Sequence, residues 1–208
     1  MPDFGLEDRA RGEGHAVVAG VDEAGRGPWA GPVVAGAVIL EAATLSAALR
    51  LGLDDSKKLS PARRNELFAL LASEATIGVG RAEVAEIDAV NILEATMRAM
   101  ARAVDALGRR PDLALIDGNR APALPCAARC VVGGDGKSLS IAAASIVAKV
   151  TRDRLMAELA ARFPGYGWER NAGYGTAEHR DALARLGVSA EHRRSYAPVR
   201  KMLGVVGA

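Results

Sequence analysis

Short apolar runs that alternate with helical segments are the feature of this sequence that most restricts its fold. Residues 16–21 and 33–40 are rich in strand-forming side chains and flank a loop punctuated by Gly and Pro, which predicts two adjacent strands of one sheet. Further strands are predicted at 77–84, 113–116 and 128–132. Because these strands alternate with helices, the sequence indicates an α/β sandwich around a mixed central sheet.

Four segments of the sequence predict helices. Ser60 as N-cap followed by Pro61 predicts the start of one helix. A continuous helix is predicted over 86–107, where apolar residues recur at steps of three and four. Another begins at Ser138 and ends near Phe163, before a Pro-Gly pair, and a further helix is predicted over 176–186.

The length and composition of the chain suit a single domain with a small appendage. The chain has 208 residues, half of them hydrophobic, which is enough for a sizeable core. We expect residues 1–14 to form a loose tail, 15–163 the main domain, and 164–208 a helical segment packed on it.

Composition also excludes several classes of protein. A net charge of +2 creates no global basic field, so nucleic-acid binding would need local patches. The two cysteines, Cys126 and Cys130, lack partners at zinc spacing, which argues against a structural zinc site or a disulfide framework. No apolar run approaches the roughly 20 residues of a membrane span. We therefore expect a soluble, cytoplasmic protein.

Acidic residues follow two of the predicted strands. Asp22 and Glu23 stand at a strand end just before Gly25, and joint action would require the strand to bend or end there, because neighbouring strand residues point to opposite faces. The alternative is an ordinary polar strand end. Asp117 leaves an apolar strand into a Gly turn, at the edge where α/β sheets commonly bind ligands; here the alternative is an Asx turn.

A third acid lies on the predicted helix that begins at Ser138. Asp153 is one helical turn from Lys149, so a surface ion pair is the alternative to a functional role. The small residues that precede it would let this helix press closely on a sheet and bring Asp153 to its edge.

Carboxylates that cluster repel one another unless a cation separates them. Oxygen-only ligands suit Mg²⁺ or Mn²⁺ rather than zinc. Two such ions about 4 Å apart would support phosphodiester hydrolysis.

Six blocks of the sequence, in order, resemble bacterial ribonuclease HII between residues 20 and about 199. They are VDEAGRGPWAGPVVAGAVIL, DDSKKLS, LIDGN, GGDGKSLSIAAASIVAKVTRDR, YGWERNAGYGTAEHRDAL and HRRSYAPV. The resemblance implies a ribonuclease H-like fold, with a mixed five-stranded sheet, flanking helices and a C-terminal helical cap. It makes 15–163 the catalytic domain.

The same resemblance implies an activity and a site. The activity is endonucleolytic cleavage of the RNA strand of RNA–DNA hybrids and 5′ of ribonucleotides in duplex DNA, which leaves 3′-hydroxyl and 5′-phosphate ends. Two divalent ions, Mn²⁺ or Mg²⁺, would be held by Asp22, Glu23, Asp117 and Asp153. Gly25, Arg26 and Gly27 would sense the ribose 2′-hydroxyl, and Tyr174 would pack on the neighbouring sugar.

Four basic residues are candidate phosphate contacts, although each is equally well explained as a solvated surface charge: Lys57, Lys58, Arg193 and Arg194. His179 and His192 are left out of the catalytic set, because the metals would serve as the base. Trp29 departs from the small aliphatic residue expected beside the sensor.

We expect a monomer with no obligatory protein partner and no membrane association. The alternatives are a type III-like enzyme that favours long hybrids and a non-catalytic hybrid-binding module.

Overall fold

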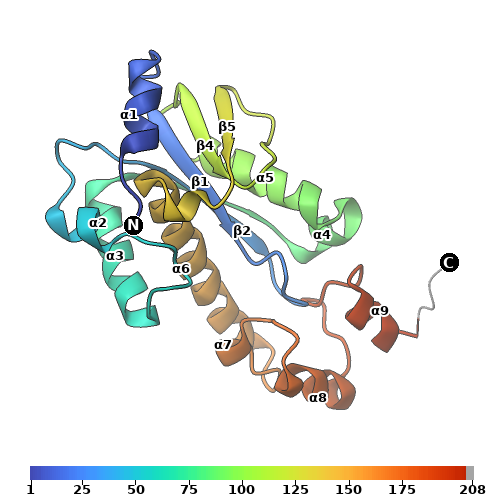
Figure 1. Cartoon of the computed structure of the whole chain (residues 1–208). Helices are drawn as coiled ribbons and strands as arrows, with labels where there is room; N and C mark the ends of the chain where they lie inside the picture. Colours follow the sequence, from blue (N-terminus) through green and yellow to red (C-terminus); the bar gives the residue numbers. More distant parts are fainter. Residues whose placement is uncertain (205–208) are drawn as a thin grey trace.

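Five strands form one open mixed sheet in the order β3-β2-β1-β4-β5 (Figure 1). The computed structural model describes residues 1–204, so residues 205–208 of the predicted C-terminal segment lie outside it. The central strand β1 runs antiparallel to β2 and parallel to β4; β3 is antiparallel to β2, and β5 is parallel to β4. The strands are β1 Val18–Ala24, β2 Val33–Ile39, β3 Thr76–Ala82, β4 Leu113–Asp117 and β5 Ala127–Val131. The predicted mixed five-stranded sheet is confirmed.

Helices cover both faces of this sheet, with α5 on one face and α6 on the other (Figure 1). Helices α2 and α3 pack on the α6 side, α7 and α8 lie beyond the far end of α6, and α9 lies apart from α6 on the side of α4 (Figure 1). The helices are α1 Gly5–Gly12, α2 Ala47–Gly52, α3 Pro61–Glu74, α4 Val84–Val90, α5 Ile92–Asp105, α6 Leu139–Arg162, α7 Trp168–Asn171, α8 Ala177–Leu186 and α9 Ala197–Met202.

Helix α6 lies unusually close to the two central strands. A Cβ atom on Gly20 would lie 2.1 Å from the carbonyl carbon of Ser140, and one on Gly36 would lie 2.6 Å from the carbonyl oxygen of Ala144. Only glycine fits at such a close approach of two backbones. The predicted tight packing of the small-residue helix on the sheet is confirmed.

The helix expected over 86–107 is instead two helices, α4 and α5. They meet at Asn91, whose φ of 71° lies in the left-handed region. The Asn91 side chain caps α5 by accepting hydrogen bonds from the amides of Leu93 and Glu94. Asn tolerates this conformation better than most residues, and the apolar periodicity runs across the break without revealing it. The predicted N-cap at Ser60 is confirmed.

The prediction of a loose N-terminal tail is wrong. Residues 5–12 form α1, and the Glu7 side chain, which is 1 % exposed, accepts hydrogen bonds from Ser138 and Ser140 at the start of α6. The charged composition of the tail concealed one buried carboxylate. Over residues 1–204, no helix is both long and apolar enough to cross a membrane.

Candidate functional site

Two parallel strands bring Asp22 and Asp117 together at their carboxyl ends. Val21 of β1 pairs with Ile116 of β4, so the two aspartates come next on each strand. Gly20 and Leu115, two residues earlier, both lie on the face that α6 covers. Because side chains two apart share a face, Asp22 and Asp117 lie side by side there.

Strand β1 ends at Ala24, directly before Gly25, so Asp22 and Glu23 lie close to its end. Asp22 and Glu23 pair with Gly36 and Ala35, and the pairing continues to Ala24. The Glu23 amide donates to Asp22 Oδ1 at 2.7 Å, and the Glu23 side chain, 14 % exposed, pairs with Arg26 at 3.3 Å.

Burial among like charges changes the acidity of this corner. Burial raises the pKa of Asp22 well above its usual value, and the charges of Glu23, Asp117 and Asp135 raise it further. Burial also raises the pKa of Glu23 against the opposing effect of Arg26. The structure therefore brings together three of the four predicted acids, and a fourth carboxylate that was not predicted joins them.

Asp135 is the acid that sequence reasoning missed. It lies in a 3-10 turn, Gly134–Gly136, that follows β5, and the Gly134 amide donates to Asp117 Oδ1 at 2.6 Å. Burial raises the pKa of Asp135, and Asp55 and Asp117 add to the effect. The signal that singled out Asp117 was an acid in a Gly-containing turn after a strand. The same signal is present in the sequence at Asp135.

Asp153 occupies a different environment from the other three predicted acids. Its Oδ1 lies 2.6 Å from Lys149 Nζ and its Oδ2 lies 3.8 Å from Arg64. It lines a separate hollow with Trp168 and Arg170. Because the Lys149 ammonium is in hydrogen-bond contact with Asp153, the structure favours the ion-pair alternative for this residue. The acid that lies with Asp22 and Asp117 in the acidic corner is Asp135.

The donor set of this corner fits a hard divalent cation. Within residues 1–204, no three Asp, Glu, His or Cys side chains are already closed around a point that would hold a metal, as expected of carboxylates that repel one another. Yet Asp22, Glu23, Asp117 and Asp135 offer only oxygen atoms. Such a set suits Mg²⁺ or Mn²⁺ and not zinc.

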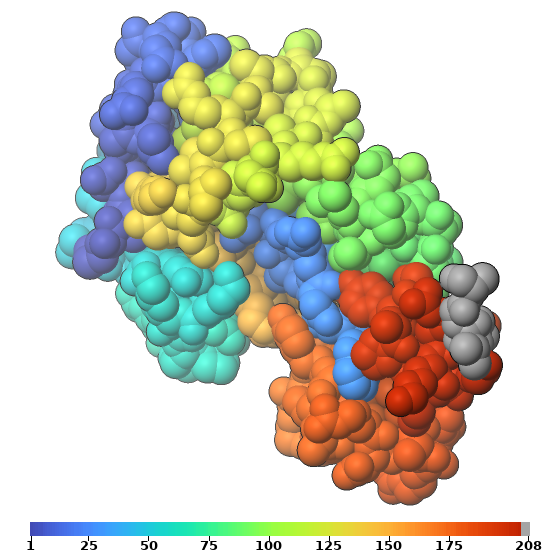
Figure 2. All heavy atoms as spheres, turned by 45° about the vertical axis from the view of Figure 1, so that its right-hand side comes forward, coloured from blue at the N-terminus to red at the C-terminus, as the bar shows by residue number. Residues whose placement is uncertain are grey.

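A hollow of about 450 Å³ opens beside the acidic corner and carries the predicted sensor. Figure 2 shows it between the cyan segment around α2 and α3 and the orange C-terminal segment. Gly25, at φ 97°, has no room for a side chain, because a Cβ would lie 2.0 Å from Arg152 Nε. Tyr174, 48 % exposed, borders the hollow next to Gly27. The remaining lining includes Glu23, Arg26, Ser56, Lys57, Arg64, Ser145 and Lys149.

Lys57 lies over the acids at the rim of this hollow. The turn that contains Lys57 is bound to α6 by a 2.6 Å hydrogen bond between the hydroxyls of Ser56 and Ser145. Burial lowers the pKa of Lys57, but the charges of Asp55, Asp22, Asp135 and Asp117 outweigh it and raise the pKa overall. Lys57 is therefore placed to meet a phosphate beside the acidic corner.

The other predicted phosphate contacts differ from Lys57. Lys58 is exposed and pairs with Asp54 at 3.3 Å, and Arg194 is exposed. Arg193 is 0 % exposed and donates to backbone carbonyl groups, so the prediction that it contacts phosphate is wrong. Arg193 stands between His192, which is buried, and Arg194, which is exposed, so the local sequence does not reveal which of the basic residues is buried.

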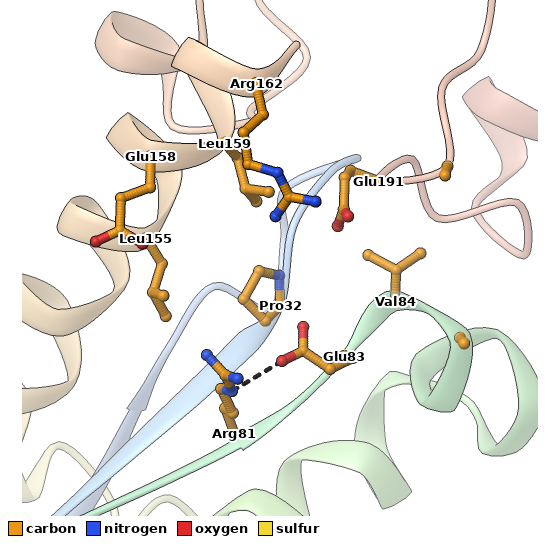
Figure 3. Close-up of a pocket in the computed structure, with 11 residues that line it drawn as sticks. Pro32, Arg81, Glu83, Val84, Leu155, Glu158, Leu159, Arg162 and Glu191 are labelled. Atoms are coloured by element: carbon orange, nitrogen blue, oxygen red, sulfur yellow. Dashed lines mark ion pairs between the residues drawn. The ribbon is translucent and has the colours of Figure 1, made fainter.

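A further hollow, of about 420 Å³, lies between α6 and the start of α4. Figure 3 shows Glu83, Arg162 and Glu191 projecting into it and Arg81 paired with Glu83. None of its lining residues belongs to the acidic corner. It adds nothing to the site.

Several known proteins are similar to this chain along nearly its whole length. A family model described as Ribonuclease HII matches residues 19–199. The ribonuclease HII of Paramagnetospirillum magneticum is 62% identical over 96% of this chain and 97% of its own length. That of Granulibacter bethesdensis is 60% identical over 99% of this chain and 93% of its own length.

Solved structures share the fold. Ribonuclease H2 from Pyrococcus horikoshii superposes with a TM-score of 0.74 at 28% identity, over 89% of this chain and 96% of that chain. Ribonuclease HII from Archaeoglobus fulgidus, solved as a complex with PCNA, has a TM-score of 0.72 at 28% identity, over 86% of this chain and 95% of that chain. The predicted ribonuclease H-like fold is confirmed.

Proposed function

The chain belongs to the ribonuclease HII family, and from this premise we propose that its acidic corner cuts phosphodiester bonds 5′ of ribonucleotides in duplex DNA as well as within RNA–DNA hybrids. Ribonuclease H activity on RNA–DNA hybrids and dependence on a divalent metal hold for this chain as for its family. The products of the proposed cleavage carry 3′-hydroxyl and 5′-phosphate ends.

The observation that carries this proposal is the convergence of four carboxylates, of which Asp22 is buried and the others half-buried, at the ends of β1 and β4 and in the turn after β5. Asp22, Glu23, Asp117 and Asp135 would hold the metal, because burial and mutual repulsion leave them in need of a cation. Two Mg²⁺ or Mn²⁺ ions would supply activation of a water molecule and stabilisation of the leaving oxygen. Lys57 would orient the phosphate.

The hollow beside the corner supports recognition of a ribonucleotide. The 2′-hydroxyl is the group that distinguishes RNA from DNA at a given position. Within the described part of the chain, the amides of Arg26 and Gly27 donate no hydrogen bond, so they are available to that hydroxyl. Tyr174 would pack on the sugar of the neighbouring deoxynucleotide.

The surroundings of the site complete the proposal. Lys58 and Arg194, both exposed, would contact phosphates farther from the cut, where such cations supply most of the affinity for a duplex. One solved relative, from Archaeoglobus fulgidus, is a complex with PCNA. For this chain we propose a cytoplasmic monomer that needs no protein partner to cleave.

The test is a labelled DNA duplex that carries one ribonucleotide. With Mg²⁺ or Mn²⁺ we expect one nick on the 5′ side of the ribonucleotide, and none with EDTA. Asp22→Asn should lower turnover by about 10²-fold or more while it spares most of the binding, since the acids do not supply the affinity for phosphates. The all-DNA duplex is the control. Equal cutting of that duplex, or normal cutting by Asp22→Asn, would refute the proposal.

A further inference from the structure

We infer that Arg193 is a positioning residue, which turns the carbonyl groups of the loop 25–32 inward so that the amides of Arg26 and Gly27 face the ribose 2′-hydroxyl. This inference rests on the proposed function, because the loop matters only where a ribonucleotide is read.

The Arg193 guanidinium is surrounded by backbone oxygens of this loop. Its Nη2 lies 2.6 Å from the Gly25 oxygen and 2.8 Å from the Gly31 oxygen, its Nη1 3.0 Å from the Arg26 oxygen, and its Nε 2.9 Å from the Gly31 oxygen. The Tyr196 hydroxyl joins the same group, since it bonds to both Arg193 and the Arg26 carbonyl. These contacts cross more than 160 residues of sequence.

A second buried arginine completes the arrangement from α6. Arg152 donates to the carbonyl oxygens of Pro32 at 3.0 Å and Ala30 at 3.2 Å. Neither Arg152 nor Arg193 forms an ion pair with a carboxylate in residues 1–204. A buried charge without such partners is costly, so the carbonyl dipoles are what stabilise both cations. The loop is thereby held in one conformation.

Peptide geometry converts these contacts into an orientation of the amides. In a planar trans peptide the carbonyl oxygen and the next amide hydrogen point in opposite directions, and the chain contains no cis bonds. The carbonyls of Gly25 and Arg26 point toward Arg193, so the amides of Arg26 and Gly27 point away from it. Those residues line the hollow beside Glu23, and their amides have no partner within residues 1–204.

Arginine is needed for this task because of its shape. A guanidinium offers five donors in a rigid plane, whereas a lysine ammonium is a point charge on a flexible stem. Lysine at position 193 would keep the charge but could not reach the three carbonyl groups together. Tyr196→Phe is a milder change, which removes only the hydroxyl that links Arg193 to the Arg26 carbonyl.

The experiment measures discrimination rather than activity alone. In an Asp22→Asn background, in which turnover is slow, affinity is measured without a divalent metal for a duplex with one ribonucleotide and for the same duplex made entirely of DNA. With Arg193→Lys we expect the preference for the ribonucleotide to fall about tenfold, as for loss of a hydrogen bond. Binding to the all-DNA duplex should change by less than about twofold, because Arg193 touches no phosphate. Tyr196→Phe should reduce the preference by less.

Arg109→Lys is the matched control, since Arg109 is exposed and pairs with Glu41; it should leave both affinities unchanged. If the preference survives in Arg193→Lys and in Tyr196→Phe, the inference is overturned. It is also overturned if Arg193→Lys weakens both duplexes equally with a shallower salt dependence, because Arg193 would then be a phosphate contact. If the Asp22→Asn parent itself shows no preference, the proposed sensor fails first. Should Arg193→Lys not fold, Tyr196→Phe decides.

Discussion

At the scale of single residues, the surroundings of a carboxylate decide whether it is free to bind a metal. Asp153 and Asp135 are both acids within conspicuous motifs. Asp153 lies 2.6 Å from Lys149 and 3.8 Å from Arg64, so its charge is already neutralised. Asp135 lies among Asp117 and Asp55 and has no cation in hydrogen-bond contact within the described residues, since Lys57 lies 3.9 Å away, and burial raises its pKa. Binding of a cation would therefore stabilise the ionised form of Asp135 more than that of Asp153.

The two aspartates therefore respond differently to loss of charge. We expect Asp135→Asn to lower kcat/KM by about 10²-fold and to raise the concentration of Mn²⁺ needed for half-maximal activity. Asp153→Asn should cost only a few-fold, because it breaks a partly exposed ion pair. Metal titrations of cleavage on one substrate compare the two variants. The opposite ranking would restore Asp153 to the site.

At the scale of elements, α1 supports the turn that carries Asp135. Glu7 Oε1 accepts hydrogen bonds from the Ser138 and Ser140 hydroxyls, each at 2.6 Å, and from the Ser140 amide at 2.9 Å. Asp3 also bonds through its backbone to Lys137 and Leu139. A negative charge at this position favours the N-terminus of α6. The N-terminal helix thus fixes the chain immediately after the turn of Asp135.

Removal of this charge should weaken the fold. Glu7→Gln keeps the shape of the side chain but replaces a carboxylate that accepts three hydrogen bonds, so we expect the free energy of unfolding to fall by about 1–3 kcal/mol. Asp8→Asn, on the exposed side of the same helix, should change it by less than about 0.5 kcal/mol. Urea denaturation measures both. Equal effects would show that Glu7 has no special role.

At the scale of the whole molecule, a buried histidine pair holds the C-terminal segment together beside the loop 25–32. His179 Nε2 accepts from Trp168 at 3.1 Å and lies 3.0 Å from His192 Nε2. The Ser189 amide donates to His192 Nδ1, so both rings are neutral, with the His192 proton on Nε2. His179 Nδ1 lies 2.9 Å from the Tyr174 carbonyl. This network connects the segment to the aromatic residue of the proposed site, and it gives both histidines a structural role.

The pair makes stability depend on pH. Burial, helped by the neighbouring His179, lowers the pKa of His192 to about 4. As the pH falls, the unfolded chain therefore takes up the proton before the folded chain does. The contribution of neutral His192 to stability is complete above about pH 6.5 and is lost as the pH falls toward 4. We expect a loss of about 2–3 kcal/mol over that range.

Denaturation at several pH values between 5 and 7 tests this dependence. His192→Gln should flatten the profile, whereas His15→Gln, near the N-terminus, should leave it unchanged. A profile of His192→Gln as steep as that of the parent would assign the dependence to other groups.

The sequence by itself determined the family and the mixed sheet, and it singled out Asp22, Glu23 and Asp117 as candidates, because local patterns place them near the ends of strands that a Gly-containing turn follows. Strand periodicity and caps such as Ser60 depend on neighbours along the chain, so they can be read directly. Only the tertiary structure showed that Asp135 lies near Asp117 while Asp153 pairs with Lys149. It also showed that Arg193 is buried against a loop more than 160 residues away and that α1 packs on the start of α6. Burial and local charge are properties of groups that meet in space, and nothing in a short stretch of sequence specifies which distant groups those are.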